Sequence, residues 1–190
     1  MRRVMGLVVI AVVVLAANLA WAASCFKVME EVQTRITWQV WNADGWAANP
    51  LLVEAVVAQN KKGPILGMDN AKWKTVPESD AVVQGFIKND VAKFLAAEMA
   101  NTDGICIGAF LNGAQGEKVA FTEKTGSYIH KGSAKFDAPF AGGKAWQGKP
   151  ELEDKIYVIQ ISVPVLSEGK PIGVLVVELN GTRLEELSKK

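Results

Sequence analysis

Histidine and cysteine are scarce in this 190-residue sequence: His130 is the only histidine, and Cys25 and Cys106 are the only cysteines. No C-x-x-C or C-x-x-C-H motif occurs. These absences exclude a histidine-based metal site, a c-type haem attachment and a disulfide framework. We therefore expect neither a metal ion nor a cofactor.

Cys106 lies inside an apolar run, where a thiol is usually unreactive and packs as a small hydrophobic residue. A disulfide with Cys25 in an oxidising compartment is the alternative. Together with His130 and Asp137, Cys106 supplies the residue types of a nucleophile, a base and an orienting acid, but their spacing supports no such set. We expect that the protein is not an enzyme.

Long charge runs, repeats and low-complexity tracts are also missing. The 21 basic and 20 acidic residues give a net charge of +1, which becomes −1 when Arg2 and Arg3 are removed with the segment described next. No basic field for nucleic acid exists.

Arg2 and Arg3 precede an apolar run over residues 4–20, which ends in the A-x-A pattern Ala20-Trp21-Ala22. This combination predicts a secretory signal peptide over 1–22. The remaining chain suits a single domain, which we expect in the periplasm or secreted.

Two alternatives for this end stay open. The apolar run is long enough for an uncleaved anchor helix. Cys25 also follows Ala22-Ala23-Ser24, which suggests a lipid-anchored protein, although the large aliphatic residue usual three places before such a cysteine is Ala22 here. No second long apolar segment follows, so a signal would need a separate membrane partner.

The first part of the domain, about 26–101, has a helical pattern. Apolar residues recur every four positions from Val28 to Val40, and Asp44-Gly45 is expected to end this helix. Asn49-Pro50 supplies an N-cap and a first-turn proline for a second helix ending near Gly63. A single helical turn is expected around Trp73, and a third helix is expected from about residue 80 to 99.

The second part, about 104–180, has a strand pattern. Four β-rich runs with turn sequences between them predict antiparallel strands, at residues 105–111, 118–122, 156–166 and 171–179. Helices followed by antiparallel strands predict an α+β domain with helices on one face of the sheet. The loop-rich stretch 123–154 is left to cover the other face, where it can enclose a pocket.

Three segments resemble the single Cache domain, the PAS-like extracytoplasmic sensor module of bacterial receptors, and in particular its free-standing exported members. They are Val119-Ala120-Phe121-Thr122 with Lys124-Thr125-Gly126-Ser127-Tyr128, then Gln160-Ile161-Ser162-Val163-Pro164-Val165, and Gly173-Val174-Leu175-Val176-Val177-Glu178-Leu179-Asn180. The resemblance covers about residues 49–182. It implies a central antiparallel sheet of five or six strands, a long N-terminal helix on one face, and a cleft for small metabolites.

The chain departs from that pattern in the loop. Related sequences read roughly Ser-Asp-Tyr-Trp-Gln-Gly-Asp-Glu, whereas Ser127, Ser133 and Ala134 stand at the acidic positions here. A buried amino group needs a carboxylate partner, so the loss of these acids and the presence of Lys131 favour an anionic or neutral ligand.

The candidate ligand residues are polar or aromatic side chains of the loop and the adjacent strands. Tyr128 offers an apolar wall with a polar end, and Gln160 and Ser162 alternate onto one strand face. Backbone amides of the loops are the alternative partners for these two polar side chains, and the two alternatives for His130 are a pocket lining and a solvated loop residue. The full set is Thr122, Tyr128, His130, Lys131, Phe136, Trp146, Gln160 and Ser162.

Two functions follow. The domain is either a periplasmic small-molecule sensor for signal transduction such as chemotaxis, working through a separate membrane receptor or kinase, or a degenerate domain that serves as a protein–protein interaction module. Trp38 and Trp41, three residues apart on one helix, belong to the core or to a homodimer interface along the N-terminal helix. The second function predicts a filled cleft and an exposed apolar helix stripe.

Overall fold

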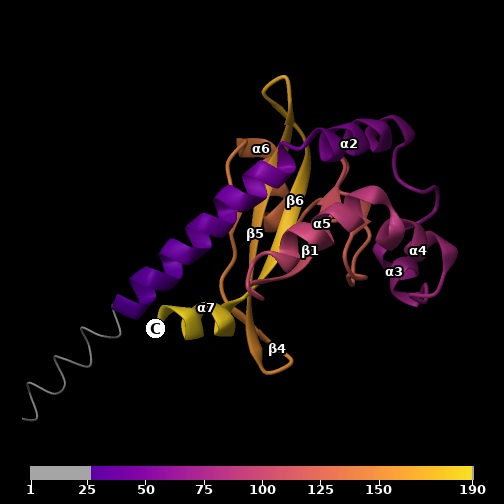
Figure 1. Ribbon diagram of the computed structural model, residues 1–190. Coiled ribbons are helices and arrows are strands. Elements are labelled where there is room, and N and C mark those ends of the chain that lie inside the picture. Colours follow the sequence, from indigo (N-terminus) through magenta and orange to yellow (C-terminus); the bar gives the residue numbers. More distant parts are fainter. Residues whose placement is uncertain (1–26, 190) are drawn as a thin grey trace, which may run out of the picture.

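The computed structural model describes residues 27–189 (Figure 1). The expected signal peptide and Cys25 lie outside this range. None of the helices between residues 27 and 189 is long and apolar enough to cross a membrane.

The helical part agrees with the sequence pattern apart from two corrections. The N-terminal helix runs through Asp44-Gly45 to residue 47, so this pair does not end it. The expected third helix is two helices, because Asn89 adopts an extended backbone and its side chain accepts a hydrogen bond from Ala92 N at 2.9 Å to cap the second one. The helices are the N-terminal helix (27–47), α2 (Pro50–Lys62), α3 (Asn70–Thr75), α4 (Ala81–Lys88) and α5 (Asp90–Ala100).

The sheet is antiparallel throughout, as the turn sequences predict, and its order is β2-β1-β6-β5-β3, with β4 also paired to β5. The stretch 123–154 is more regular than expected, since it contains one helix and two short strands. Proline at position 139 and several glycines hide this regularity from a sequence pattern. The elements are β1 (Cys106–Asn112), β2 (Lys118–Phe121), α6 (Ala134–Gly142), β3 (Trp146–Gln147), β4 (Glu151–Glu153), β5 (Ile156–Ser167), β6 (Lys170–Asn180) and α7 (Gly181–Ser188).

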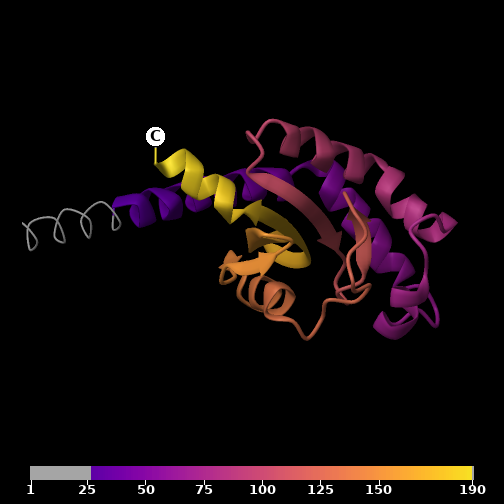
Figure 2. The ribbon, with the colours of Figure 1, turned by 90° about the horizontal axis from the view of Figure 1, so that it is seen from below.

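Each face of the sheet carries its own core. The N-terminal helix, α2 and α5 cover one face (Figures 1 and 2), which buries residues such as Leu111, Ile161 and Leu175. The other face, which we call the α6 face, carries Phe110 and Val176 and packs against α6, the loop before it, and residues of α3 and α4. The expected long helix on one face is therefore confirmed.

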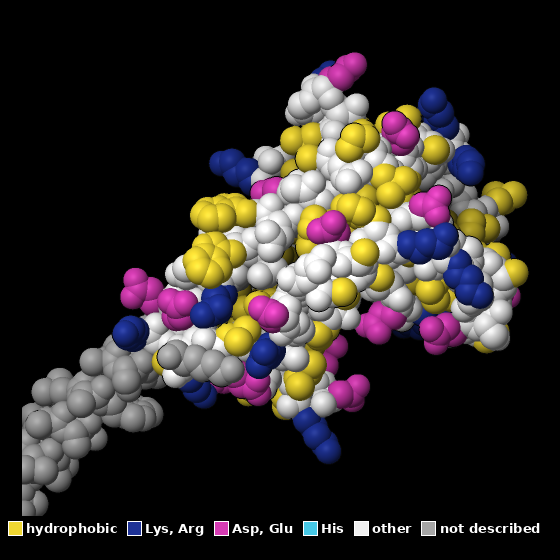
Figure 3. Space-filling model, in the orientation of Figure 1, with side chains coloured by type: hydrophobic (Ala, Val, Ile, Leu, Met, Phe, Trp, Pro, Cys, Tyr) yellow, Lys and Arg dark blue, Asp and Glu magenta, His cyan; other side chains and the backbone are white. Residues whose placement is uncertain are grey.

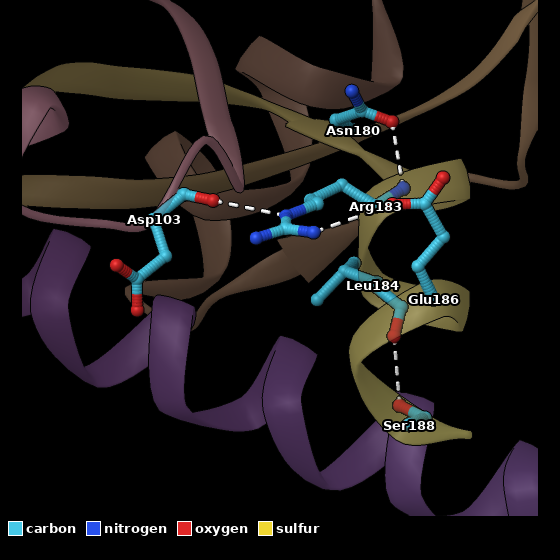
Figure 4. A network of polar contacts seen from close by, with 6 residues as sticks. All are labelled: Asp103, Asn180, Arg183, Leu184, Glu186 and Ser188. Atoms are coloured by element: carbon cyan, nitrogen blue, oxygen red, sulfur yellow. Dashed lines mark hydrogen bonds and ion pairs between the residues drawn. The ribbon is translucent and has the colours of Figure 1, made fainter. Parts of the chain in front are cut away.

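The helix α7, which the sequence pattern missed, ties the C-terminal end of the sheet to the rest of the fold (Figure 4). The side chain of Asn180 accepts a hydrogen bond from Arg183 N at 2.9 Å and caps the helix. Arg183 Nε donates to the carbonyl of Asp103 at 3.1 Å. Arg35 of the N-terminal helix donates to Leu187 O at 3.3 Å, so the two terminal helices lie side by side.

Gly116 holds the loop of residues 127–131 against the turn between β1 and β2. It has a φ of 80°, its carbonyl accepts from His130 N at 2.8 Å, and a Cβ here would overlap the backbone N of Lys131. Gly132 also has a positive φ, 94°, but open space around the position of its Cβ.

We therefore expect Gly116→Ala to destabilise the domain by about 3 kcal/mol or more, and Gly132→Ala by about 1–2 kcal/mol from backbone strain alone. Urea unfolding of the two variants measures the difference. Equal losses would show that the loop does not need this close approach.

Candidate ligand site

The α6 face is organised around the ring of Phe110. Phe110 pairs in register with Phe121 of β2 and Val176 of β6, and Val176 pairs with Ser162 of β5. Lys118 Nζ lies 3.2 Å from the centroid of the Phe110 ring. The imidazole of His130 stacks on the same ring with centroids 4.7 Å apart. Asn112 pairs with Lys118 and with Val174, one of the apolar residues of this face.

Four of these side chains, Asn112, Lys118, His130 and Ser162, form what we call the polar cluster. All are buried, and within residues 27–189 no hydrogen-bond partner reaches Asn112 Nδ2 and Oδ1, Lys118 Nζ, His130 Nε2 or Ser162 Oγ. Folded proteins satisfy most buried polar atoms, and each one left unpaired costs about 1–3 kcal/mol. The position of these unpaired atoms on one sheet face makes this face the candidate site for a polar ligand.

Lys118 has the most costly position in the cluster because, unlike the equally buried Asn112 and Ser162, its side chain is ordinarily charged. Burial lowers the pKa of Lys118 well below its ordinary value, Glu178 opposes the shift, and Lys135 adds to it. No carboxylate lies within ion-pair distance of Lys118 in the described part of the chain. A bound anion would supply the negative partner that a protonated amine needs at this buried position.

His130 is kept neutral by the same surroundings. Burial lowers the pKa of His130 to about 3, Lys118 and Lys135 contribute, and the backbone of Ser127 opposes the shift. A neutral imidazole has one nitrogen that accepts a hydrogen bond and one that donates, so His130 suits a ligand with polar atoms better than it suits a purely electrostatic contact.

This pKa shift predicts a pH-dependent stability. Between pH 6.5 and about 3 the unfolded chain binds a proton at His130 that the folded domain does not bind. Stability therefore falls as pH falls through this window, by up to about 1.4 kcal/mol per pH unit from this residue. We expect His130→Gln to flatten the decline, as measured by urea unfolding at pH 7, 5.5 and 4.5. An equal decline in stability with falling pH in the wild type and the variant would show that His130 is not its cause.

A chain of hydrogen bonds borders the polar cluster. Lys135 Nζ of α6 donates to Gln160 Oε1 at 2.8 Å, and Gln160 Nε2 donates to Glu178 Oε1 at 2.8 Å. Lys135 Nζ also lies 5.9 Å from the centroid of the Phe110 ring. Gly108 leaves room for the carboxylate, since a Cβ there would lie 2.6 Å from Glu178 Oε2. The α6 face thus has the amines of Lys118 and Lys135 near the Phe110 ring, and Gln160 separates Lys135 from the carboxylate of Glu178.

The structure brings several of the residues expected from the sequence together. His130 and Ser162 belong to the polar cluster, and Gln160 borders it. Phe136 of α6 packs with Phe110 in the core of this face. Trp146 is half-buried on β3, opposite Ser162.

Of the other three expected residues, two are hydrogen-bonded within the fold and one is exposed. Tyr128 is buried among Trp73, Phe86 and Phe121, and its phenol oxygen accepts from Ile65 N at 2.9 Å. Thr122 Oγ1 accepts from Ala109 N at 3.0 Å, which joins β2 to β1. Lys131 is exposed.

Three residues of the site were missed by the sequence reasoning: Asn112, Lys118 and Lys135. The signal for Lys118 was present, because this lysine opens a strand that is otherwise apolar. Asn112 was interpreted only as a turn residue, and Lys135 only as part of a loop. The expectation of an anionic or neutral ligand did not depend on any of them, yet two of the three are basic.

Cys106 and His130 lie in the cores of opposite sheet faces. Burial raises the pKa of the Cys106 thiol to about 11, opposed by a hydrogen bond from Thr102, and the thiol forms no disulfide within residues 27–189. Asp137 Oδ1 accepts from Gly132 N at 3.0 Å. The three residue types of a catalytic set are therefore not brought together.

Solved structures similar to this chain are sensor domains. The sensor domain of the V. cholerae histidine kinase DctB matches with a TM-score of 0.57 and 14% identity, covering 92% of this chain and 60% of that one. The ligand-binding domain of the Pseudomonas aeruginosa PAO1 amino acid chemoreceptor PctC, in complex with GABA, gives 0.49 and 12%, covering 90% and 64%. The ligand-binding domain of the Campylobacter jejuni chemoreceptor Tlp3, in complex with L-norvaline, gives 0.47 and 16%, covering 85% and 59%.

The match to the DctB sensor domain shows the fold: the described part of the chain has the Cache-type α+β fold, so the resemblance seen in the sequence is confirmed at that level. The chain spans about three fifths of the length of these sensor domains. No protein-family model matches the sequence, and no curated protein is significantly similar to it. The matched structures are named as sensor or ligand-binding domains, which is consistent with the expectation of a protein that is not an enzyme.

Proposed function

We propose that this protein is an exported sensor domain that binds a small anionic or neutral metabolite at the polar cluster and signals through a separate membrane receptor or kinase. The observation that carries the proposal is the buried Nζ of Lys118, which has no partner among the described residues and shares its sheet face with further unpaired polar atoms of Asn112, His130 and Ser162. A ligand with a carboxylate and a second polar group would satisfy these atoms.

The location follows from the N-terminal sequence. A basic pair, an apolar run and an A-x-A site before residue 23 are typical of export. The fold supports the proposal, since the V. cholerae histidine kinase DctB carries a sensor domain of this fold.

The experiment is a thermal unfolding panel of the purified protein with short carboxylates, amino acids, amines and nucleobases. A ligand that binds only the folded state stabilises it by RT ln(1 + [L]/Kd), about 2.7 kcal/mol at one hundred times Kd. We expect a short carboxylate to raise Tm in a concentration-dependent way.

Two lysine variants show where the ligand binds. Lys118→Met should remove the response, because it deletes the buried amine. Lys131→Met should retain it, because Lys131 is exposed outside the cluster. A response that survives Lys118→Met would contradict the proposed site, and a panel without any response would contradict the sensor function.

A protein–protein interaction module is the second candidate, and the surface of the N-terminal helix favours it. Trp38 and Trp41 are 47% and 64% exposed, so neither belongs to the core. Figure 3 shows hydrophobic side chains exposed along the N-terminal helix. An open, mostly apolar groove of about 830 Å³ runs between this helix and α7, with Val32 and Tyr157 in its lining. In this case Trp41→Ala would abolish partner binding or self-association and leave ligand responses unchanged.

A further inference from the structure

The amine of Lys118 is placed as a nucleophile would be. Its Nζ lies over the face of Phe110 at 3.2 Å and 6.0 Å from the centroid of Phe121, and nothing in residues 27–189 accepts a hydrogen bond from it. An amine desolvated among aromatic rings and close to a second lysine favours its neutral form, which keeps the lone pair. Its lowered pKa agrees with this geometry.

Separate groups are available on the same face for a carboxylate. Lys135 Nζ is held by a neutral acceptor, Gln160 Oε1, and not by an acid, so its charge is not neutralised there. Ser162 Oγ and Asn112 Nδ2 are donors without partners. A ligand that carries a carbonyl carbon next to a carboxylate would therefore place its carboxylate against these groups and its carbonyl against Lys118.

We propose that Lys118 binds a small 2-oxo acid covalently and reversibly as an imine. This inference rests on the proposed function, since it assigns the ligand class of the same site. All four residues of the polar cluster are buried, which favours small 2-oxo acids over large ones.

The reaction needs no oxidant or reductant. The Nζ lone pair attacks the carbonyl carbon and forms the C–N bond, while the C=O π pair moves to oxygen; one proton then passes from the nitrogen to this oxygen and gives a carbinolamine. The second proton passes from the nitrogen to the hydroxyl group, the C–O bond breaks and water leaves, so that amine plus carbonyl gives imine plus water. Nε2 of the neutral His130, which has no partner and stacks on the same ring, is placed to carry a proton between nitrogen and oxygen.

The test is reductive trapping in the purified full chain. The protein is incubated with glyoxylate or 2-oxoglutarate and cyanoborohydride, and intact mass and peptide mapping locate the reduced adduct. We expect one adduct, on Lys118, formed about tenfold or more faster than at the exposed Lys131, with glyoxylate faster than 2-oxoglutarate. Lys118→Met should lose it, with its folding checked by Tm.

Glycolate, which has the carboxylate of glyoxylate but no carbonyl, separates the two proposals. If glycolate or another carboxylate raises Tm through Lys118 and no 2-oxo acid is trapped there, the imine is overturned and the sensor function stands. Adducts spread evenly over the exposed lysines would overturn the imine as well. If neither a Tm shift nor an adduct depends on Lys118, both proposals fail.

Discussion

Replacing Trp73 with alanine should destabilise the domain by about 3–5 kcal/mol, the range found for large aromatic residues in protein cores. Trp73 is fully buried at the end of the α6 face. Its ring contacts Phe86 and Phe121 edge-on, with centroids 6.2 and 6.0 Å apart, and lies 5.5 Å from Tyr128. Its Nε1 donates to Thr125 O at 2.8 Å, so the substitution also leaves a carbonyl without its donor.

The matched control is Trp41→Ala. The same atoms are removed, but Trp41 is 64% exposed, so the free energy of unfolding should change by no more than about 0.5 kcal/mol. Urea unfolding at pH 7 measures both variants. A loss at Trp41 as large as that at Trp73 would show that the N-terminal helix is covered in solution, as a homodimer along this helix requires.

The sequence predicts the architecture of this domain because its elements carry local signals. Asn49-Pro50 places the start of α2 correctly, and the period of two in the C-terminal runs finds β5 and β6 almost to the residue. The division of the third helix at Asn89 was missed, since the apolar pattern continues across it and only the backbone conformation reveals the break. Helix α6 was missed because Pro139 and the flanking glycines are typical of loops.

The site was predicted less well, and for a physical reason. Alternation along one strand identifies the face on which Gln160 and Ser162 lie. It does not show which residue of a distant strand faces them. Lys118 reaches Phe110 through the pairing of β2 with β1, and β1 pairs with β6, contacts that depend on the topology of the sheet and not on local sequence.

Tyr128 is a second case in which the local sequence does not show which side chains surround a residue. The sequence suggests a pocket residue, because a tyrosine in a loop has a ring and a hydroxyl to offer a ligand. In the structure its ring packs among core aromatics and its hydroxyl group is bonded to Ile65 N. Whether it also contacts a ligand is a prediction that the response of a Tyr128→Phe variant would test, since this change keeps the ring and removes the oxygen.

Lys118→Met should have the opposite effect to Trp73→Ala and stabilise the protein, by about 1–4 kcal/mol at pH 7. The two side chains are similar in length, and replacing a buried amine by an apolar group of similar volume removes a desolvation cost that Glu178 offsets only in part. The same variant should lose ligand binding. Stability gained together with binding lost is the expected signature of a residue that is retained for function.

The pH dependence distinguishes this explanation from better packing by methionine. Burial lowers the pKa of Lys118 in the folded state. As pH rises, the folded domain therefore releases this proton first, and the unfolded chain keeps it up to about the ordinary pKa of 10.5. Wild-type stability therefore rises with pH toward that value, whereas the variant lacks this contribution. The advantage of Lys118→Met should shrink between pH 7 and pH 9.5 in urea unfolding, and the exposed Lys131→Met should show no such trend. An advantage that stays constant with pH would mean that methionine packs better than lysine, and that the buried amine is not the source of the cost.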